Sequence, residues 1–166
     1  MDVPVREAIP IAQLVDELND SLDDPVRDRT RHPFVRAVEN GTASKDQIAG
    51  WLNQFGLWAD PTNKLFGVQW AKCPDDDLRE GILENMLEEE YGESSKTSGH
   101  MRLIDATIRE LGWSDERRAR DDMKLESYLF KHWAEVVIRN RTFVEGLAAT
   151  SFAAERINPL VFAKIE

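Results

Sequence analysis

Three side chains in this sequence, Glu90, His100 and Glu155, have the chemistry of metal ligands and stand at the edges of apolar helical faces. Glu90 continues a stripe at the three-and-four spacing of a buried helix face, which comprises Leu78, Ile82, Leu83, Met86 and Leu87. His100 stands ten residues later at the head of a second stripe, which comprises Leu103, Ile104, Thr107, Ile108 and Leu111. Carboxylates and imidazoles on helices that face one another are the ligands of non-haem iron and manganese sites. The pattern therefore predicts a metal site.

Glu155 extends the argument to a third helix, which we expect from Thr142 to Phe162 and which is apolar over most of its surface. A carboxylate on such a face costs several kcal/mol to bury unless a cation accompanies it. Arg156 follows it in sequence but points about 100° away around the helix. The partner is therefore either a metal ion or another arginine, such as Arg139 or Arg141, and both alternatives stay open.

Each of these residues also has a simpler explanation. A single histidine at a helix start is more often a cap, and Glu90 belongs to a glutamate triplet of the kind that usually faces solvent. We expect its neighbours Glu88 and Glu89 to turn away from the apolar stripe, and we expect His32 and His132 to have structural roles. Three possible ligands on the apolar faces of three different helices favour the metal site over these simpler explanations by a small margin.

The composition excludes several classes of function. The chain of 166 residues fits one domain, 1–166, and 42% of its residues are hydrophobic. Its formal net charge of −10 argues against nucleic acid and anionic membranes as partners. Neither a signal peptide nor the roughly 20 apolar residues of a membrane span is found, so we expect a cytoplasmic protein. The single cysteine excludes an internal disulfide.

Helix signals in the first half of the chain predict how these side chains are positioned. A capping box from Ser44 to Gln47 begins a helix, and one face of that helix carries Ile48, Trp51, Leu52, Phe55 and Trp58. Pro61 should interrupt this helix, because proline cannot donate the backbone hydrogen bond of a helix interior. Cys73 ends the following segment, and we interpret it as a small core residue.

Further signals frame the two candidate ligands Glu90 and His100. The acids from Asp75 to Asp77 favour the positive end of the helix that carries Glu90, and a Gly, Ser and Thr run after Tyr91 should break it. A long helix is expected from Met123 to Asn140. Since no alternating strand pattern is found, we predict an all-α bundle of about seven or eight helices.

Several segments together resemble a known family: HPF at His32, the capping box, CPDDDLR, EEEYGE followed by SGH, and AAERINP near the end. The chain is similar to the haem-oxygenase-like di-iron oxidases, which are relatives of the TenA and PqqC proteins. The likeness covers nearly the whole chain from His32 onward. Its most specific part is the Glu-Tyr-Gly segment with a histidine ten residues after the glutamate. The resemblance implies an all-α, haem-oxygenase-like helical bundle.

The resemblance also implies roles for the three candidate residues. In that family the glutamate before Tyr-Gly and the histidine after it bind iron, which implies ligands at Glu90 and His100. A glutamate on a later core helix is usually a bridging ligand, and Glu155 matches it. The implied cofactor is Fe(II)/Fe(III), with two irons, and manganese is an alternative.

The sequence departs from the family pattern in two places. The remaining family ligands lie on a final core helix with the pattern His-x-x-x-Asp-x-x-His, which this sequence lacks. Because three ligands cannot hold two irons, we expect a longer natural chain that continues past Glu166 with this helix. The alternatives are a truncated chain and a degenerate relative that has lost the iron-dependent chemistry. Some members also have a carboxylate on the helix before Glu90, about where this sequence has Lys64 and Leu65.

These arguments lead to one expected function and two alternatives. The resemblance implies an O₂-activating di-iron oxidase or oxygenase acting on a small fatty-acid-like or amino-acid-like substrate, with an external electron donor, and we expect a homodimer. The alternatives are a metal-free enzyme of the TenA or PqqC kind and a non-catalytic helical interaction module. TenA-type thiaminases need a catalytic cysteine, for which Cys73 is a poor candidate.

Overall fold

The computed structural model of the chain describes residues 9–22, 28–60 and 62–150. These residues form helices and contain no β-strand, which confirms the predicted all-α fold. The helices are α1 (Ile11–Leu22), η1 (Arg29–Arg31), α2 (Pro33–Glu39), α3 (Lys45–Ala59), α4 (Thr62–Lys72), α5 (Asp76–Tyr91), α6 (His100–Glu110), α7 (Asp115–Arg120), α8 (Leu125–Asn140) and α9 (Phe143–Leu147). Residues 148–150 follow α9 as a π-helical turn.

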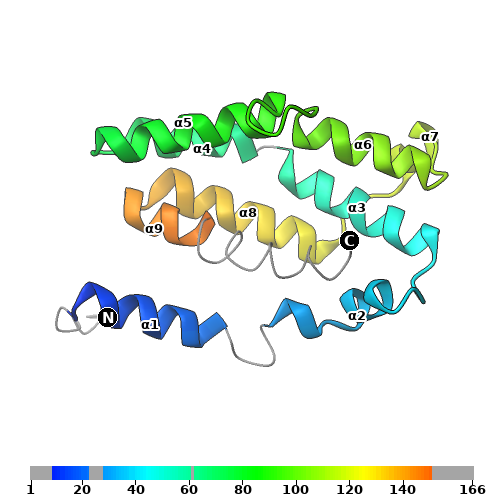
Figure 1. Cartoon of the computed structure of the whole chain (residues 1–166), viewed down its shortest axis with the longest axis horizontal. Helices are drawn as coiled ribbons and strands as arrows, with labels where there is room; N and C mark the ends of the chain where they lie inside the picture. The colour runs from blue at the N-terminus through cyan, green and yellow to red at the C-terminus, as the bar shows by residue number, and fades with distance from the viewer. Residues whose placement is uncertain (1–8, 23–27, 61, 151–166) are drawn as a thin grey trace.

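In Figure 1, α5 and α6 lie in the upper row with α4 alongside α5, α8 and α9 lie in the row below, and α1 and α2 form the lowest row. α4 pairs with α5 and also contacts α8 and α9, while α8 in turn lies against α3. α6 contacts both α5 and α3, so the end of α5 and the start of α6 form a corner of the bundle. In the described part of the chain, no helix combines the length and the apolar character that crossing a membrane requires.

Most helix ends follow the capping signals of the sequence. The backbone N–H of Gln47 donates to Ser44 Oγ at 3.2 Å, and the backbone N–H of Ser44 donates to Gln47 Oε1 at 2.8 Å. The predicted capping box is therefore confirmed, and Asp75 caps α5 in the expected way. α3 and α4 are separate helices, as the proline between them predicts, although Pro61 itself lies outside the described residues.

A buried cluster fixes the direction of α6 relative to α3. Ala49 and Ile108 are fully buried at its centre, and Trp113 is 7% exposed. The indole N–H of Trp113 donates to Asp46 Oδ1 at 2.9 Å, and the guanidinium of Arg117 lies 4.1 Å from the indole ring centre. This cluster packs α6 against α3. It thereby fixes the position of the whole helix, including His100 at its start.

Aromatic side chains join α3 to α2 and α8. Neighbouring ring centres lie between 4.9 and 6.0 Å apart in the contacts that link Phe34, Trp51, Phe55, Trp58, Phe130 and Trp133. Such spacings are typical of offset or edge-to-face aromatic pairs. The aromatic residues predicted to share a face of α3 do contact one another, but their rings are half-buried, and Trp133 on α8 is 46% exposed.

The apolar stripe predicted on the helix before the glycine break is not a buried face. Leu78, Leu83 and Leu87 are exposed, Ile82 and Met86 are half-buried, and no residue of α5 is fully buried. This expectation was wrong because α5 is an outer helix that packs mainly on α4, so only one narrow row of its side chains faces inward.

Candidate functional site

The end of α5 and the start of α6 meet in a tight corner that brings the backbones of Glu90 and His100 together. Gly92 ends α5 in the left-handed conformation, with φ of +64°. A side chain at Gly99 would run into the carbonyl group of Glu90, so glycine is required where the loop returns to α5. His100 then begins α6 directly beside the last turn of α5.

The imidazole of His100 faces the first two acids of the Glu88–Glu90 triplet. Its Nδ1 atom lies 2.8 Å from Glu89 Oε2, and its Nε2 atom lies 4.0 Å from Glu88 Oε1. Both acids face the loop that returns to α5 and not open solvent, since their side chains are only 20% and 24% exposed. The acid–imidazole pair at this corner is Glu89–His100.

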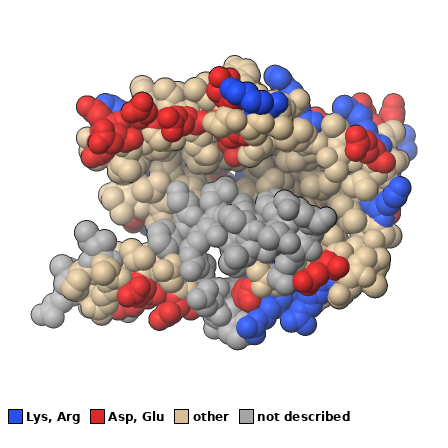
Figure 2. Space-filling view, in the orientation of Figure 1, with Lys and Arg blue, Asp and Glu red and all other residues tan. Residues whose placement is uncertain are grey.

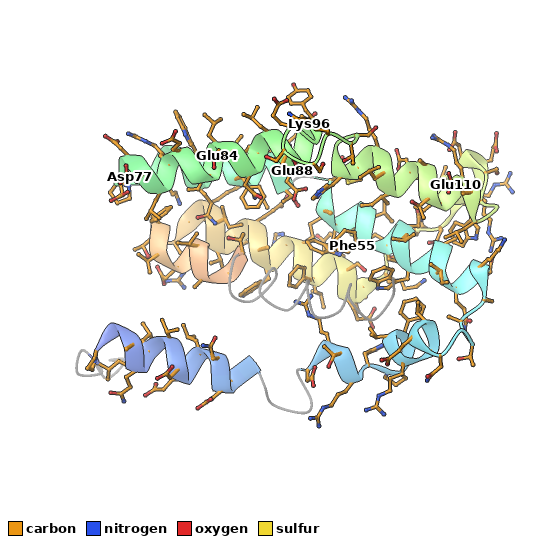
Figure 3. All side chains as sticks on the ribbon, viewed as in Figure 1. Phe55, Asp77, Glu84, Glu88, Lys96 and Glu110 are labelled. Atoms are coloured by element: carbon orange, nitrogen blue, oxygen red, sulfur yellow. The ribbon has the colours of Figure 1, made fainter. Side chains whose placement is uncertain are left out.

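Glu88 holds the loop in place. Its Oε2 atom accepts hydrogen bonds from the backbone N–H groups of Ser94 at 2.7 Å and Ser95 at 3.1 Å. Hydrogen bonding from Ser95 is the main cause that lowers the pKa of Glu88 below its ordinary value of 4.5. Figure 3 shows Glu88 near the end of α5 and Lys96 on the loop above it. The carboxylate is therefore ionised at neutral pH and adds negative charge to the corner.

Glu90 has a partner on α4 that the sequence did not reveal. The side-chain amide of Asn63 donates from Nδ2 to Glu90 Oε2 at 2.7 Å. The Asn63 Oδ1 atom is buried, and no hydrogen-bond donor reaches it in the described structure. Of the two residues expected near this place, Lys64 is exposed and Leu65 belongs to the core. The packing of α4 on α5 places the first turn of α4 beside the last turn of α5. Asn63 could have been identified as the partner of Glu90 only from this register.

The groups at this corner fit an iron or manganese ion in their chemistry. Carboxylate oxygens, an imidazole and an amide oxygen are hard or borderline donors, and the buried Asn63 Oδ1 is an acceptor without a donor. Within the described ranges, no three His, Cys, Asp or Glu residues are grouped closely enough to hold a metal. Glu155 lies outside those ranges. The structure thus brings Glu90 and His100 to one corner, and their role as ligands stays a prediction.

The other candidate residues have structural surroundings. His32 Nδ1 accepts a hydrogen bond from the backbone N–H of Phe34 at 3.1 Å and caps α2, which confirms its expected role. His132 is exposed and stacks on Tyr128, with ring centres 6.0 Å apart. Cys73 is only 4% exposed, which confirms the interpretation of a small core residue.

Comparison with known proteins supplies a family. A model of the TENA/THI-4/PQQC family matches residues 20–136 of the chain. The matched segment includes Asn63, Glu90 and His100, and it ends before Glu155. No curated protein matches the chain.

Proposed function

The chain belongs to the TENA/THI-4/PQQC family, and from this premise we propose that it is a non-haem iron-dependent oxidase or oxygenase. The proposed site holds two irons and uses O₂ and an external electron donor. Its substrate is a small organic molecule of fatty-acid-like or amino-acid-like character. Membership supports the helical fold and an enzymatic role, and the residues of the α5–α6 corner support the iron-dependent chemistry.

The observation that carries this proposal is the contact between Glu89 and His100. A metal-binding imidazole usually donates its other ring N–H to a carboxylate, which orients the ring and raises its basicity. The 2.8 Å separation between His100 Nδ1 and Glu89 Oε2 supplies this interaction. In this proposal Nε2 of His100 would be the atom that binds iron, and Glu89 would be a positioning residue.

The remaining residues of the proposed site have separate tasks. Glu90 and Glu155 would be carboxylate ligands, and Asn63 orients Glu90 through its hydrogen bond of 2.7 Å. Glu88 ties the loop to α5, which keeps His100 at the corner. Iron bound there would supply the one-electron chemistry that O₂ requires. Carboxylates suit this cofactor because they are hard ligands and neutralise its charge.

Iron loading under anaerobic conditions tests the proposal. The purified chain is incubated with Fe(II), desalted and analysed for iron per chain, and a pulse of O₂ is then followed by visible absorption. Specifically bound iron and a transient band are expected; since Glu90, His100 and Glu155 alone cannot hold two irons, two irons per chain are expected only of a chain that also carries the remaining ligands of the pattern. His100→Ala and Glu90→Gln should each lower the iron content, whereas His132→Ala, which changes an exposed histidine on α8, should not. A wild-type chain that retains no iron above the level of both variants would refute the proposal.

A metal-free enzyme of the same family is the second candidate. It is favoured by the polar contacts of the corner, since Glu90 and His100 both have protein partners. The thiaminase branch of that alternative needs a nucleophilic cysteine. Cys73 is buried, and its thiol donates to the carbonyl oxygen of Asp75 at 3.3 Å, so its sulfur is not accessible for attack on a substrate. The iron-dependent proposal is therefore preferred.

A further inference from the structure

A small cavity, called here the α3–α4–α8 cavity, lies among these three helices and the turn after α9. Its volume is about 30 Å³. One water molecule needs about 10–15 Å³ of such space, whereas sites for small organic molecules have about 300–1,000 Å³. The cavity therefore has room for a molecule of two or three atoms and is too small for the organic substrate.

Apolar side chains form most of the described lining of this cavity. Leu65 and Phe66 on α4 are 6% and 8% exposed, and Ile138 on α8 is 1% exposed. The other apolar members of the described lining are Trp58, Phe130, Ala134 and Ala149. Apolar cavities in proteins take up apolar guests such as xenon, because their walls offer water few hydrogen bonds.

Two polar residues of the described lining, Lys131 and Thr150, already make hydrogen bonds within the protein. The ammonium of Lys131 donates to the carbonyl oxygen of Leu57 at 3.2 Å. Thr150 Oγ1 accepts from the Gln69 amide at 3.0 Å and lies 3.2 Å from the carbonyl oxygen of Gly146. Since a buried water needs about two to four polar partners, these contacts favour an apolar guest over water.

The cavity wall adjoins the proposed iron site along α4. Thr62, the first residue of α4, lines the cavity, and the next residue, Asn63, donates to Glu90 Oε2 at 2.7 Å. Of the molecules that the proposed reaction uses, O₂ is the one that is both apolar and small enough for this space.

The surface charge of the bundle does not hinder such a guest. Figure 2 shows acidic side chains gathered along α5 on the outer surface. An anion would be repelled by these groups and a cation would be held by them, whereas an uncharged gas is affected by neither force.

We propose that the α3–α4–α8 cavity holds O₂ beside the iron site. Binding of the gas rests on the cavity alone, whereas its use in the reaction rests on the proposed function. The O₂ molecule is held unchanged in the cavity, so no bond forms or breaks there.

Relaxation of methyl protons by dissolved O₂ tests this inference in the chelator-treated, iron-free chain. O₂ is paramagnetic, so it accelerates the relaxation of the protons beside which it binds, and spectra under O₂ and N₂ give the difference. Methyl groups of Leu65, Ile138 and Ala149 report on the cavity. Those of Ala49 and Ile108 are the control, because both residues are fully buried in the α3–α6 cluster. The increase should be roughly threefold larger at the cavity methyls, since a close-packed core has little space for a gas.

Ala134 allows a graded pair of variants. It lines the cavity on α8, so Ala134→Val and Ala134→Leu should fill the space to an increasing extent. The increase caused by O₂ at Leu65 and Ile138 should fall in this order, to about half or less in Ala134→Leu, because the guest loses its volume. Ala106→Leu, which changes an exposed alanine on α6, should leave it unchanged. Amide spectra check that each variant is folded, and Ala134→Val keeps the test decisive if Ala134→Leu does not fold.

Three results would overturn the inference. The first is an equal effect of O₂ on the cavity and control methyls of the folded wild-type chain. The second is an effect that neither folded Ala134 variant reduces. The third is a cross-peak from water to the Leu65 methyl groups without an excess effect of O₂, which would show that water occupies the cavity. A chain that shows the excess but binds no iron would refute the proposed function and support the binding of O₂.

Discussion

Nδ1 of His100 lies 2.8 Å from Oε2 of Glu89, so the imidazole meets the middle acid of the Glu88–Glu90 triplet and not the last one. Glu90 reaches the opposite way, to Asn63 on α4. Two consecutive acids at the end of α5 therefore contact different helices: Glu89 contacts α6, and Glu90 contacts α4. Glu89 orients the histidine, and Glu90 is left beside α4, where a buried amide oxygen has no donor.

This division predicts different consequences for two substitutions of the same kind. Glu90→Gln removes a proposed iron ligand and should nearly abolish Fe(II) binding. Glu89→Gln leaves the ligands in place but weakens the orientation of His100, and loss of such a positioning carboxylate costs about 10- to 100-fold in metal affinity. Competition of Fe(II) with a chromophoric chelator measures both affinities, and Glu93→Gln on the exposed loop is the control. A larger loss for Glu89→Gln than for Glu90→Gln would reverse the two roles.

Gly99 should tolerate no side chain. Gly99→Ala would place a methyl group against the carbonyl of Glu90, and such overpacking destabilises a fold by about 1–3 kcal/mol. The displaced loop should also move His100 and lower iron content. Gly81→Ala is the matched control, because its methyl group meets open space inside a helix and should stabilise the chain by about 0.5–1 kcal/mol. Urea unfolding distinguishes the two, and equal stability of both variants would contradict the close approach at Gly99.

The local features of this fold could be predicted because each depends on a few neighbouring residues. The Ser44–Gln47 box, the break at Gly92 and the helix start at His100 follow from backbone preferences alone. The all-α class follows in the same way, since helical periodicity is visible along the chain.

The partners at the corner could not be predicted, because they depend on the path of a loop and on helix register. Glu89 and Glu90 differ by about 100° around the helix, and only the returning loop decides which of them meets His100. Asn63 meets Glu90 because of the register of α4 against α5. The exposure of Leu83 on α5 likewise reflects which neighbours the helix has.

Asp121 ties α3 to the segment before α8, and its contribution should depend on pH. It accepts hydrogen bonds from Asn53 Nδ2 and Gln54 Nε2, both at 3.0 Å. Burial alone raises the pKa of Asp121, but these hydrogen bonds and the charges of Lys124 and Arg117 together lower it below the ordinary 3.8. Because the folded-state pKa is lower than the unfolded one, the stabilisation is present above pH 3.8 and is lost as the pH falls through the folded-state pKa.

Asp121→Ala should therefore destabilise the chain by about 1–3 kcal/mol at pH 7, because it leaves the buried amide of Asn53 without its acceptor. The difference from wild type should shrink as the pH is lowered below 3.8. Urea unfolding at several pH values measures it. Asp122→Ala is the control, since Asp122 contributes only its backbone carbonyl to Gln54. A difference that stays constant with pH would show that ionisation of Asp121 is not involved.

Lys72, the last residue of α4, caps the C-terminus of α8. Its ammonium donates to the carbonyl oxygens of Ile138 at 2.7 Å, Arg139 at 2.8 Å and Arg141 at 2.9 Å. The last carbonyls of a helix lack partners within the helix and carry its negative end, so a cation there is favourable. The same contacts hold the C-terminus of α4 against the C-terminus of α8.

Lys72→Met keeps most of the side-chain length and removes the three donors, so it should cost about 1–3 kcal/mol, as measured by urea unfolding. Amide hydrogen exchange should accelerate in the last turn of α8 more than in its middle, because the loss is local. Lys64→Met, which changes an exposed lysine on the same helix, should alter stability by less than about 0.5 kcal/mol. If Lys72→Met were no less stable than Lys64→Met, the carbonyls at the end of α8 would be equally well satisfied by water, and Lys72 would not stabilise the packing of α4 on α8.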